Sequence, residues 1–139
     1  SSRPGLHAQV YCVLQIGYFK AKRAFFRFDW SEVEDDCAFV LSRYFHGEPF
    51  ERKAITKHER YTQRERVAEL FGYRPWAADF LPQLAQQAEQ IVRRDVTLGF
   101  VAAELIVWLN GHKIIRPGYT TLQELVSEVL SAERRRLGS

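Results

Sequence analysis

A basic, aromatic stretch near the start of this sequence has the residue types that contact nucleic acid. It reads KAKRAFFRFDW, and its basic residues are Lys20, Lys22, Arg23 and Arg27. Cations of this kind pair with phosphates and aromatic rings stack on bases, so the stretch is compatible with a nucleic-acid surface. The alternative, favoured by the weight of aromatic rings in protein cores, is that Phe25, Phe26 and Phe28 are core anchors.

Positive charge lies on both sides of an acidic segment. The formal net charge is +3 and the pI is about 9.0, which permits nucleic-acid binding without indicating it. Residues 1–30 hold five basic residues and one acidic, residues 31–51 one and six, and residues 52–74 seven and three. From residue 75 onward there are seven of each. This distribution predicts a basic patch on a neutral background.

Sequence signatures of catalysis are missing. The chain has no glycine-rich phosphate loop, HExxH, GxSxG or CxxC spacing. Its histidines are spread along the chain and are expected at the surface or in turns; they are His7, His46, His58 and His112. We therefore expect no catalytic site, no bound metal and no cofactor in these residues.

Two further groups of residues have structural explanations. The acidic run Glu32, Glu34, Asp35 and Asp36 suits the first turn of a helix, where carboxylates complement the dipole, with a metal site as the alternative. Cys12 and Cys37 lie among apolar neighbours, and no signal peptide precedes them. We expect reduced, buried thiols of a cytoplasmic protein, with a disulfide or a metal pair as the alternative.

The most apolar stretch, residues 97–110, predicts a central helix. Ten of its fourteen residues are apolar and they surround the helix axis, which is typical of a helix buried on nearly all sides. Thr97 is expected to cap its start, and Gly111 to adopt the left-handed conformation at its end. Glu104, its only charge, should face the one gap to solvent.

Other helices are expected around it. Apolar spacing predicts a first helix from Pro4 to about Phe19, and a Ser31/Glu34 capping box opens a second that ends before Gly47. Of the boxes Thr56/Glu59 and Thr62/Glu65, the second is expected to start a helix over residues 63–71. A helix to about Arg94 starts at Pro75 or Pro82, Thr121/Glu124 caps the last helix, and residues 113–117 form an extended connector.

The predicted fold is an all-α, compact bundle of five to seven helices around the central helix 97–110. Residues 62–94, with a turn at Gly72, have the outline of a helix-turn-helix. At 139 residues the chain fits one domain spanning 1–139, with two lobes, 1–50 and 51–139, as the alternative. The absence of methionine indicates a piece of a longer protein.

Four segments resemble, in the same order, the N-terminal region of the Tn-three family of replicative (class II) transposases. These are LQIGYFKAKRAFFRFDWSEVEDDCAFVLSRYF (14–45), YTQRERVAELFGYRPW (61–76), KIIRP (113–117) and TTLQELVSEVLSAERRR (120–136). Together they span nearly the whole chain. Ile16 departs from the leucine expected after Gln15, and Glu65 and Arg66 stand where the family often has a histidine.

The resemblance implies a helical DNA-binding region that recognises the terminal inverted repeats of a transposon. The acidic, metal-binding residues that cut DNA in such transposases lie beyond the stretch present here, so this chain would bind double-stranded DNA without cleaving it. The implied partners are that DNA, the remainder of the transposase chain and a homodimer formed through the full-length protein. The implied location is the bacterial cytoplasm, with no membrane contact.

If the chain binds DNA, nine residues are candidate contacts. Lys20, Lys22, Arg23 and Arg27 would hold one stretch of backbone, and Arg60, Gln63, Arg64, Arg66 and Arg74 another. Gln63 and Arg64 are expected early on their helix, where base-reading residues commonly lie. For any one arginine, a solvated helix face is the alternative.

A different class of function is also open. The chain would then be a helical protein-interaction or dimerisation module, with the Phe-rich stretch and residues 73–76 forming an apolar contact patch. This alternative predicts association with little dependence on salt, whereas DNA binding through phosphates weakens steeply as salt rises.

Overall fold

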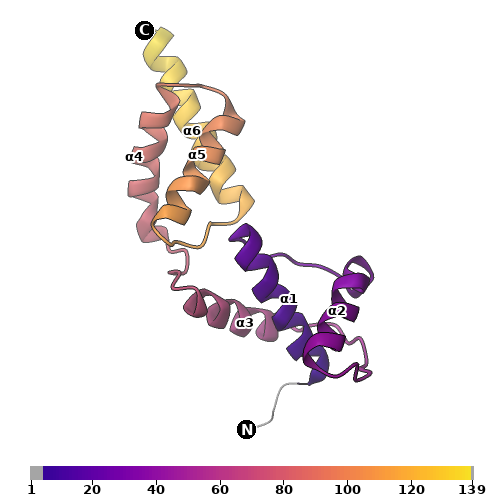
Figure 1. The fold of residues 1–139 in the computed structure, drawn as a ribbon. Coiled ribbons are helices and arrows are strands. Elements are labelled where there is room, and N and C mark those ends of the chain that lie inside the picture. The colour runs from indigo at the N-terminus through magenta and orange to yellow at the C-terminus, as the bar shows by residue number, and fades with distance from the viewer. Residues whose placement is uncertain (1–4, 139) are drawn as a thin grey trace. The chain divides into compact units, whose positions relative to one another are not determined.

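A computed structural model describes residues 5–138 of the chain. Six α-helices follow one another (Figure 1): α1 (Leu6–Lys22), α2 (Glu34–Tyr44), α3 (Lys57–Leu70), α4 (Leu81–Val92), α5 (Leu98–Gly111) and α6 (Tyr119–Gly138). Short 3-10 helices, η1 (Trp30–Val33) and η2 (Ala78–Phe80), precede α2 and α4. The all-α class is confirmed. The expected start of the first helix at Pro4 lies outside the described residues.

The chain divides into two compact units, Ser1–Phe71 and Gly72–Ser139, referred to as unit 1 and unit 2. In unit 1, α1 packs against both α2 and α3. In unit 2, α4, α5 and α6 pack against one another. The boundary therefore lies after Phe71 and not after residue 50, because α3 shares its buried side with α1.

This division also corrects the expected helix-turn-helix at 62–94. Its first helix, α3, belongs to unit 1, and its second, α4, belongs to unit 2. Gly72, with φ 73°, does form the left-handed turn between them. The helix after it begins at Leu81, with Pro82 in its first turn, so the later of the two expected starts is confirmed.

Unit 1 has a core of apolar side chains on α1, η1 and α2. Val10 and Leu14 of α1 meet Val33, Cys37 and Val40. Cys37 is buried, Cys12 is half-buried, and both are free thiols. Burial raises the pKa of each thiol above its ordinary value, which keeps both protonated at neutral pH.

Helix starts in unit 1 differ from those expected. The box before α2 joins Asp29 to Glu32, whose carboxylate accepts the Asp29 backbone N–H at 3.0 Å, so the expected Ser31/Glu34 box is wrong. α3 starts at the Thr56/Glu59 box, where Glu59 N–H donates to Thr56 Oγ1 at 3.1 Å. Thr62 consequently lies inside α3.

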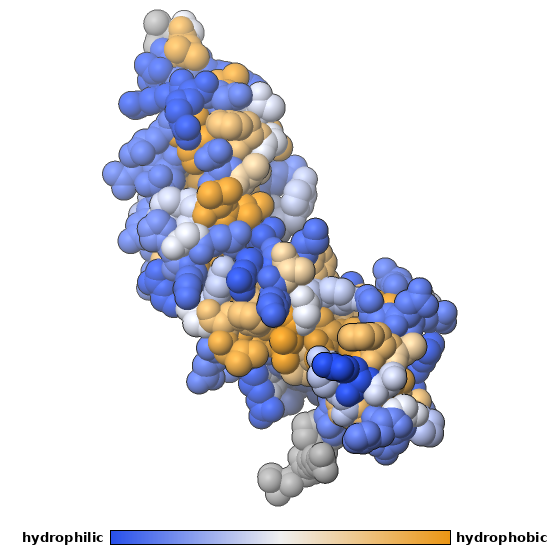
Figure 2. Space-filling view, in the orientation of Figure 1, coloured by the Kyte–Doolittle hydropathy of each residue, from blue (hydrophilic) through white to orange (hydrophobic). Residues whose placement is uncertain are grey.

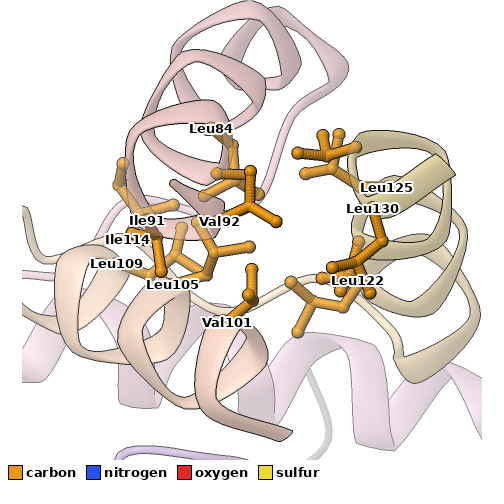
Figure 3. Packing of buried hydrophobic residues seen from close by; sticks show 13 residues of the cluster. Leu84, Ile91, Val92, Val101, Leu105, Leu109, Ile114, Leu122, Leu125 and Leu130 are labelled. Atoms are coloured by element: carbon orange, nitrogen blue, oxygen red, sulfur yellow. The ribbon is translucent and has the colours of Figure 1, made fainter. Parts of the chain in front are cut away.

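The three α-helices of unit 2 form a bundle with one hydrophobic core. Figure 3 shows leucine, isoleucine and valine side chains of α4, α5 and α6 pointing toward one another. They include Leu84, Ile91, Val92, Val101, Leu105, Leu109, Leu122, Leu125 and Leu130. α6 begins at Tyr119, two residues before the expected cap at Thr121.

Helix α5 is buried along one line and not on nearly all sides. Val101, Leu105 and Leu109, four residues apart, have no exposed surface. Leu98 and Val107 are 46% and 64% exposed, while Glu104 is half-buried. Among the described residues of unit 2, α5 packs against two α-helices, α4 and α6, which do not cover its whole circumference.

The end of α5 also differs from the prediction. Gly111 stays helical, and Lys113 takes the left-handed conformation, with φ 52°. Ile114 N–H donates to Leu109 O at 2.9 Å and Lys113 N–H to Asn110 O at 3.1 Å, the hydrogen-bond pattern of a Schellman motif. Ile114, buried on Leu109, starts the extended connector and makes an isolated parallel bridge with Arg74. No β-strand occurs within residues 5–138.

Hydrophilic side chains cover much of the face drawn in Figure 2 in both units, with smaller hydrophobic areas between them. None of the helices in residues 5–138 has the combination of length and apolar character that crossing a bilayer requires.

Candidate functional site

The basic, aromatic stretch forms the loop that follows α1, and Gln15 fixes its position. Arg23 ends α1 in the left-handed conformation, with its N–H donating to Phe19 O at 2.7 Å. The Gln15 side chain, 5% exposed, donates through Nε2 to Phe26 O and accepts the Phe26 N–H at 3.4 Å. A buried amide that holds both backbone groups of Phe26 gives this loop a defined path.

Phe25 of this loop packs inward, Phe26 is 43% exposed, and two arginines lie over rings of this region. Phe25 stacks on the buried Phe19 with centroids 4.9 Å apart, and Phe71 lies 5.2 Å from Phe19. The guanidinium of Arg23 lies 5.3 Å from the Phe71 centroid, and that of Arg64 lies 5.5 Å from the Phe25 centroid. Cation–π contact of this kind orients both guanidinium groups.

Helix α3 presents its candidate residues on different sides. Arg60 and Arg64 are four residues apart and share a face, whereas Arg66 is rotated roughly 200° from Arg64 at 3.6 residues per turn. In agreement, the Arg66 charge acts on the Cys12 thiol, where it partly offsets the rise in pKa that burial causes. Arg66 therefore lies away from the Arg60/Arg64 face.

Gln63 is a structural residue and is not available to read bases. It is 9% exposed and its Nε2 donates to Ala8 O of α1 at 3.0 Å. It also lies in the middle of α3, since that helix starts at Lys57. The expectation that Gln63 and Arg64 lie early on their helix is wrong, because the first of the two capping boxes is the one used.

The remaining candidates are spread over three places. Lys20 and Lys22 are exposed in the last turn of α1, and their two-residue spacing points them in roughly opposite directions. Arg74 belongs to unit 2, where its Nη2 donates to His112 O at 3.2 Å and its guanidinium lies 5.1 Å from the Phe80 centroid. Residues 23–29, between α1 and η1, are referred to as the Phe-rich loop. The structure groups four arginines around this loop, referred to as the arginine group: Arg23, Arg27, Arg60 and Arg64.

Sequence reasoning missed one member of this region. Arg52 lies in the segment before α3 and lines a cleft of about 290 Å³ together with Arg27, Arg60 and the ring of Trp30. Arg52 is the first residue of the basic segment 52–74, so the charge distribution of the sequence could have indicated it. Its position in the same cleft as Arg27 depends on contacts between distant segments, which no local pattern reveals.

The acidic run has a structural role next to this loop. Asp36, in the first turn of α2, accepts a hydrogen bond from the Tyr18 hydroxyl at 2.5 Å. Burial and this hydrogen bond raise the pKa of Tyr18 to about 12. Within the described residues, no three His, Cys, Asp or Glu side chains gather as metal ligands would.

Residues 1–129 match the family described as domain of unknown function (DUF4158). The chain belongs to this family. The DUF4158 match covers both compact units and ends within α6. Searches of curated proteins and of solved structures found no significant match.

Proposed function

We propose that this DUF4158 chain is the DNA-binding region at the front of a Tn-three family replicative transposase, where it recognises the terminal inverted repeats. The observation that carries the proposal is the arginine group. Arg23 and Arg27 come from the Phe-rich loop, and Arg60 and Arg64 come from α3. The rings of Phe71 and Phe25 orient Arg23 and Arg64, and Arg60 donates to Ile55 O. The collinear resemblance of residues 14–136 to that family supports the same function.

In this proposal the arginine group supplies phosphate contacts, and Arg64, exposed on α3, is the base-reading candidate. Lys22 adds a phosphate contact next to the loop. The chain binds double-stranded DNA without cleaving it and holds no cofactor. The rest of the transposase, and a second copy through the full-length protein, are the proposed partners in the bacterial cytoplasm.

Fluorescence anisotropy with a duplex carrying the inverted repeat tests the proposal. Arg64→Ala should weaken binding by roughly 5- to 150-fold, the range for a base-reading arginine, and Lys22→Ala should reduce the salt slope by about 1. Arg43→Ala, which removes the same charge from the last turn of α2, is the matched control and should change affinity little. Unchanged affinity and salt slope in both test variants would show the assignment to be wrong.

The second candidate is a protein-interaction module, which exposed apolar side chains on α5 and just before it favour. Val96, Leu98 and Val107 are 55%, 46% and 64% exposed. The patch expected at residues 73–76 is not available, since Tyr73 is buried and Trp76 packs on the unit 2 core. Sedimentation at two salt concentrations, with and without DNA, separates the candidates: this one predicts self-association that salt leaves unchanged and that Val107→Asp abolishes.

A further inference from the structure

A recessed cleft in unit 1 combines arginines with aromatic rings. Its volume is about 290 Å³, and α1, the segment before η1, the segment before α3 and the first turn of α3 form its walls. The side chains that matter in its lining are Tyr11, Arg27, Phe28, Trp30, Arg52 and Arg60. Four separate segments of the chain therefore contribute to one concave site.

Contacts within unit 1 hold the walls of the cleft in place. The Trp30 indole N–H donates to Lys53 O at 3.0 Å, which ties two walls together. Arg60 donates through Nη1 to Ile55 O at 2.7 Å, and Tyr11 stacks on Phe28 with centroids 4.3 Å apart. A site with walls fixed in this way loses little conformational entropy when it takes a ligand.

The charge balance of the cleft favours an anion. Arg27 makes no hydrogen bond or ion pair with the described residues. Arg52 faces Glu34 at 3.6 Å, but both side chains are about half exposed or more, so this pair is weak. Asp29 is the one carboxylate of the described lining, and its side chain caps the start of η1. Guanidinium donors therefore remain open for a phosphate, which they match in geometry.

The volume of the cleft and its aromatic lining limit the kinds of anion that it can bind. The cleft volume of about 290 Å³ lies just below the range for small-molecule sites, roughly 300–1,000 Å³, and suits a ligand as small as one nucleotide. A backbone phosphate alone would make no contact with Phe28 and Trp30, whose rings line the cleft as well as packing on Tyr11. In a duplex, neighbouring bases cover the faces of each base, whereas an unpaired nucleotide presents its base to an aromatic wall.

We propose that this cleft binds one unpaired nucleotide of a DNA strand, with its phosphate on Arg27, Arg52 and Arg60 and its base against Phe28 and Trp30. The choice of DNA as the source of the nucleotide rests on the proposed function. The site itself does not include Arg64 or Lys22, so the two proposals can fail separately.

The Trp30 indole N–H reports on the cleft in NMR spectra of the full chain. The chain has three tryptophans, so Trp30→Phe identifies the Trp30 signal. Thymidine 5′-monophosphate, and an inverted-repeat duplex with a short single-stranded overhang, should shift this signal. Thymidine without phosphate, and the same duplex with blunt ends, should leave it in place. Trp76 and Trp108, which belong to unit 2, are internal controls.

Arg52→Ala should weaken nucleotide binding at least fivefold, and Arg52→Lys should recover only part of it, because a lysine lacks the planar fork. Arg43→Ala is the control of equal charge. The proposal is overturned if neither the nucleotide nor the overhang moves the Trp30 signal, if thymidine or the blunt duplex moves it equally, or if Arg52→Ala binds as the wild type does. Loss of salt-dependent duplex binding with the Trp30 response intact would instead reject the proposed function alone.

Discussion

Tyr18 connects α1 to α2, and its hydroxyl should make stability depend on alkaline pH. Because its pKa is raised to about 12 by burial and by Asp36, the protonated hydroxyl is favoured in the folded state. Its contribution is complete below a pH of about 10 and is lost as pH rises through the folded pKa.

We predict that Tyr18→Phe lowers the free energy of unfolding by about 1 kcal/mol at neutral pH. The difference from wild type should shrink above a pH of about 10. Denaturant unfolding at several pH values measures it, and Tyr119→Phe, at a site 76% exposed, serves as the control. A difference that grows with pH would contradict the assignment.

Gln15 is the residue on which the path of the Phe-rich loop depends. Gln15→Ala would leave the N–H and C=O of Phe26 without their side-chain partner, which costs about 1–3 kcal/mol when such groups stay buried. We therefore expect lower stability and weaker duplex binding together, measured by denaturant unfolding and anisotropy. Gln86→Ala, exposed on α4, should change neither. Weaker binding without any loss of stability would indicate direct contact of Gln15 with DNA.

At the scale of elements, the start of α3 is the clearest test. Two Thr-x-x-Glu boxes follow each other in the sequence, and only Thr56/Glu59 is formed. Thr56→Ala should lower the free energy of unfolding by about 1 kcal/mol. Thr62→Ala, at a site inside the helix, should lower the free energy of unfolding by less than half of that amount or should raise it. Thermal unfolding of the two variants measures this, and the reverse order would show that α3 begins at Thr62.

The same box predicts a dependence on acid. The Thr56 backbone N–H, donating to the Glu59 carboxylate at 2.9 Å, lowers the pKa of Glu59 below its ordinary value. Stability from this contact is present above the unfolded pKa, about 4.3, and is lost as pH falls through the folded pKa. Glu59→Gln should therefore be less stable than wild type at pH 7 and approach it in acid. Unfolding at a series of acidic pH values is the measurement.

At the scale of the molecule, each unit has a core of its own. The buried side chains of the unit 2 core all come from residues 84–130. A destabilising substitution in this core should therefore lower the stability of unit 2 and leave that of unit 1 unchanged. Leu105→Ala, at a site with no exposed surface, should cost about 2–5 kcal/mol. Hydrogen exchange should quicken in α4, α5 and α6 while the slowest amides of α1 and α3 keep their protection. Val107→Ala, on the exposed side of α5, is the matched control.

The sequence by itself determined the class of this protein and most of its helices. Apolar residues at three- and four-residue steps require a helix with a buried side, and glycine and proline positions end or start helices through backbone geometry alone. The all-α fold, the position of α5 and the basic blocks around the Phe-rich stretch follow from these local rules. These local rules apply to a segment of the chain regardless of which other segments pack against it.

Only the tertiary structure decided between local alternatives of similar strength. Packing of α3 on α1 selected the Thr56 box, buried Gln63 on Ala8 and moved the boundary between units to Phe71. The tertiary structure also placed Arg66 near Cys12 and brought Arg52 to the cleft with Arg27. The physical reason is that burial and side-chain pairing depend on contacts between segments far apart in the chain, whose free energies exceed those of a cap or a single surface charge.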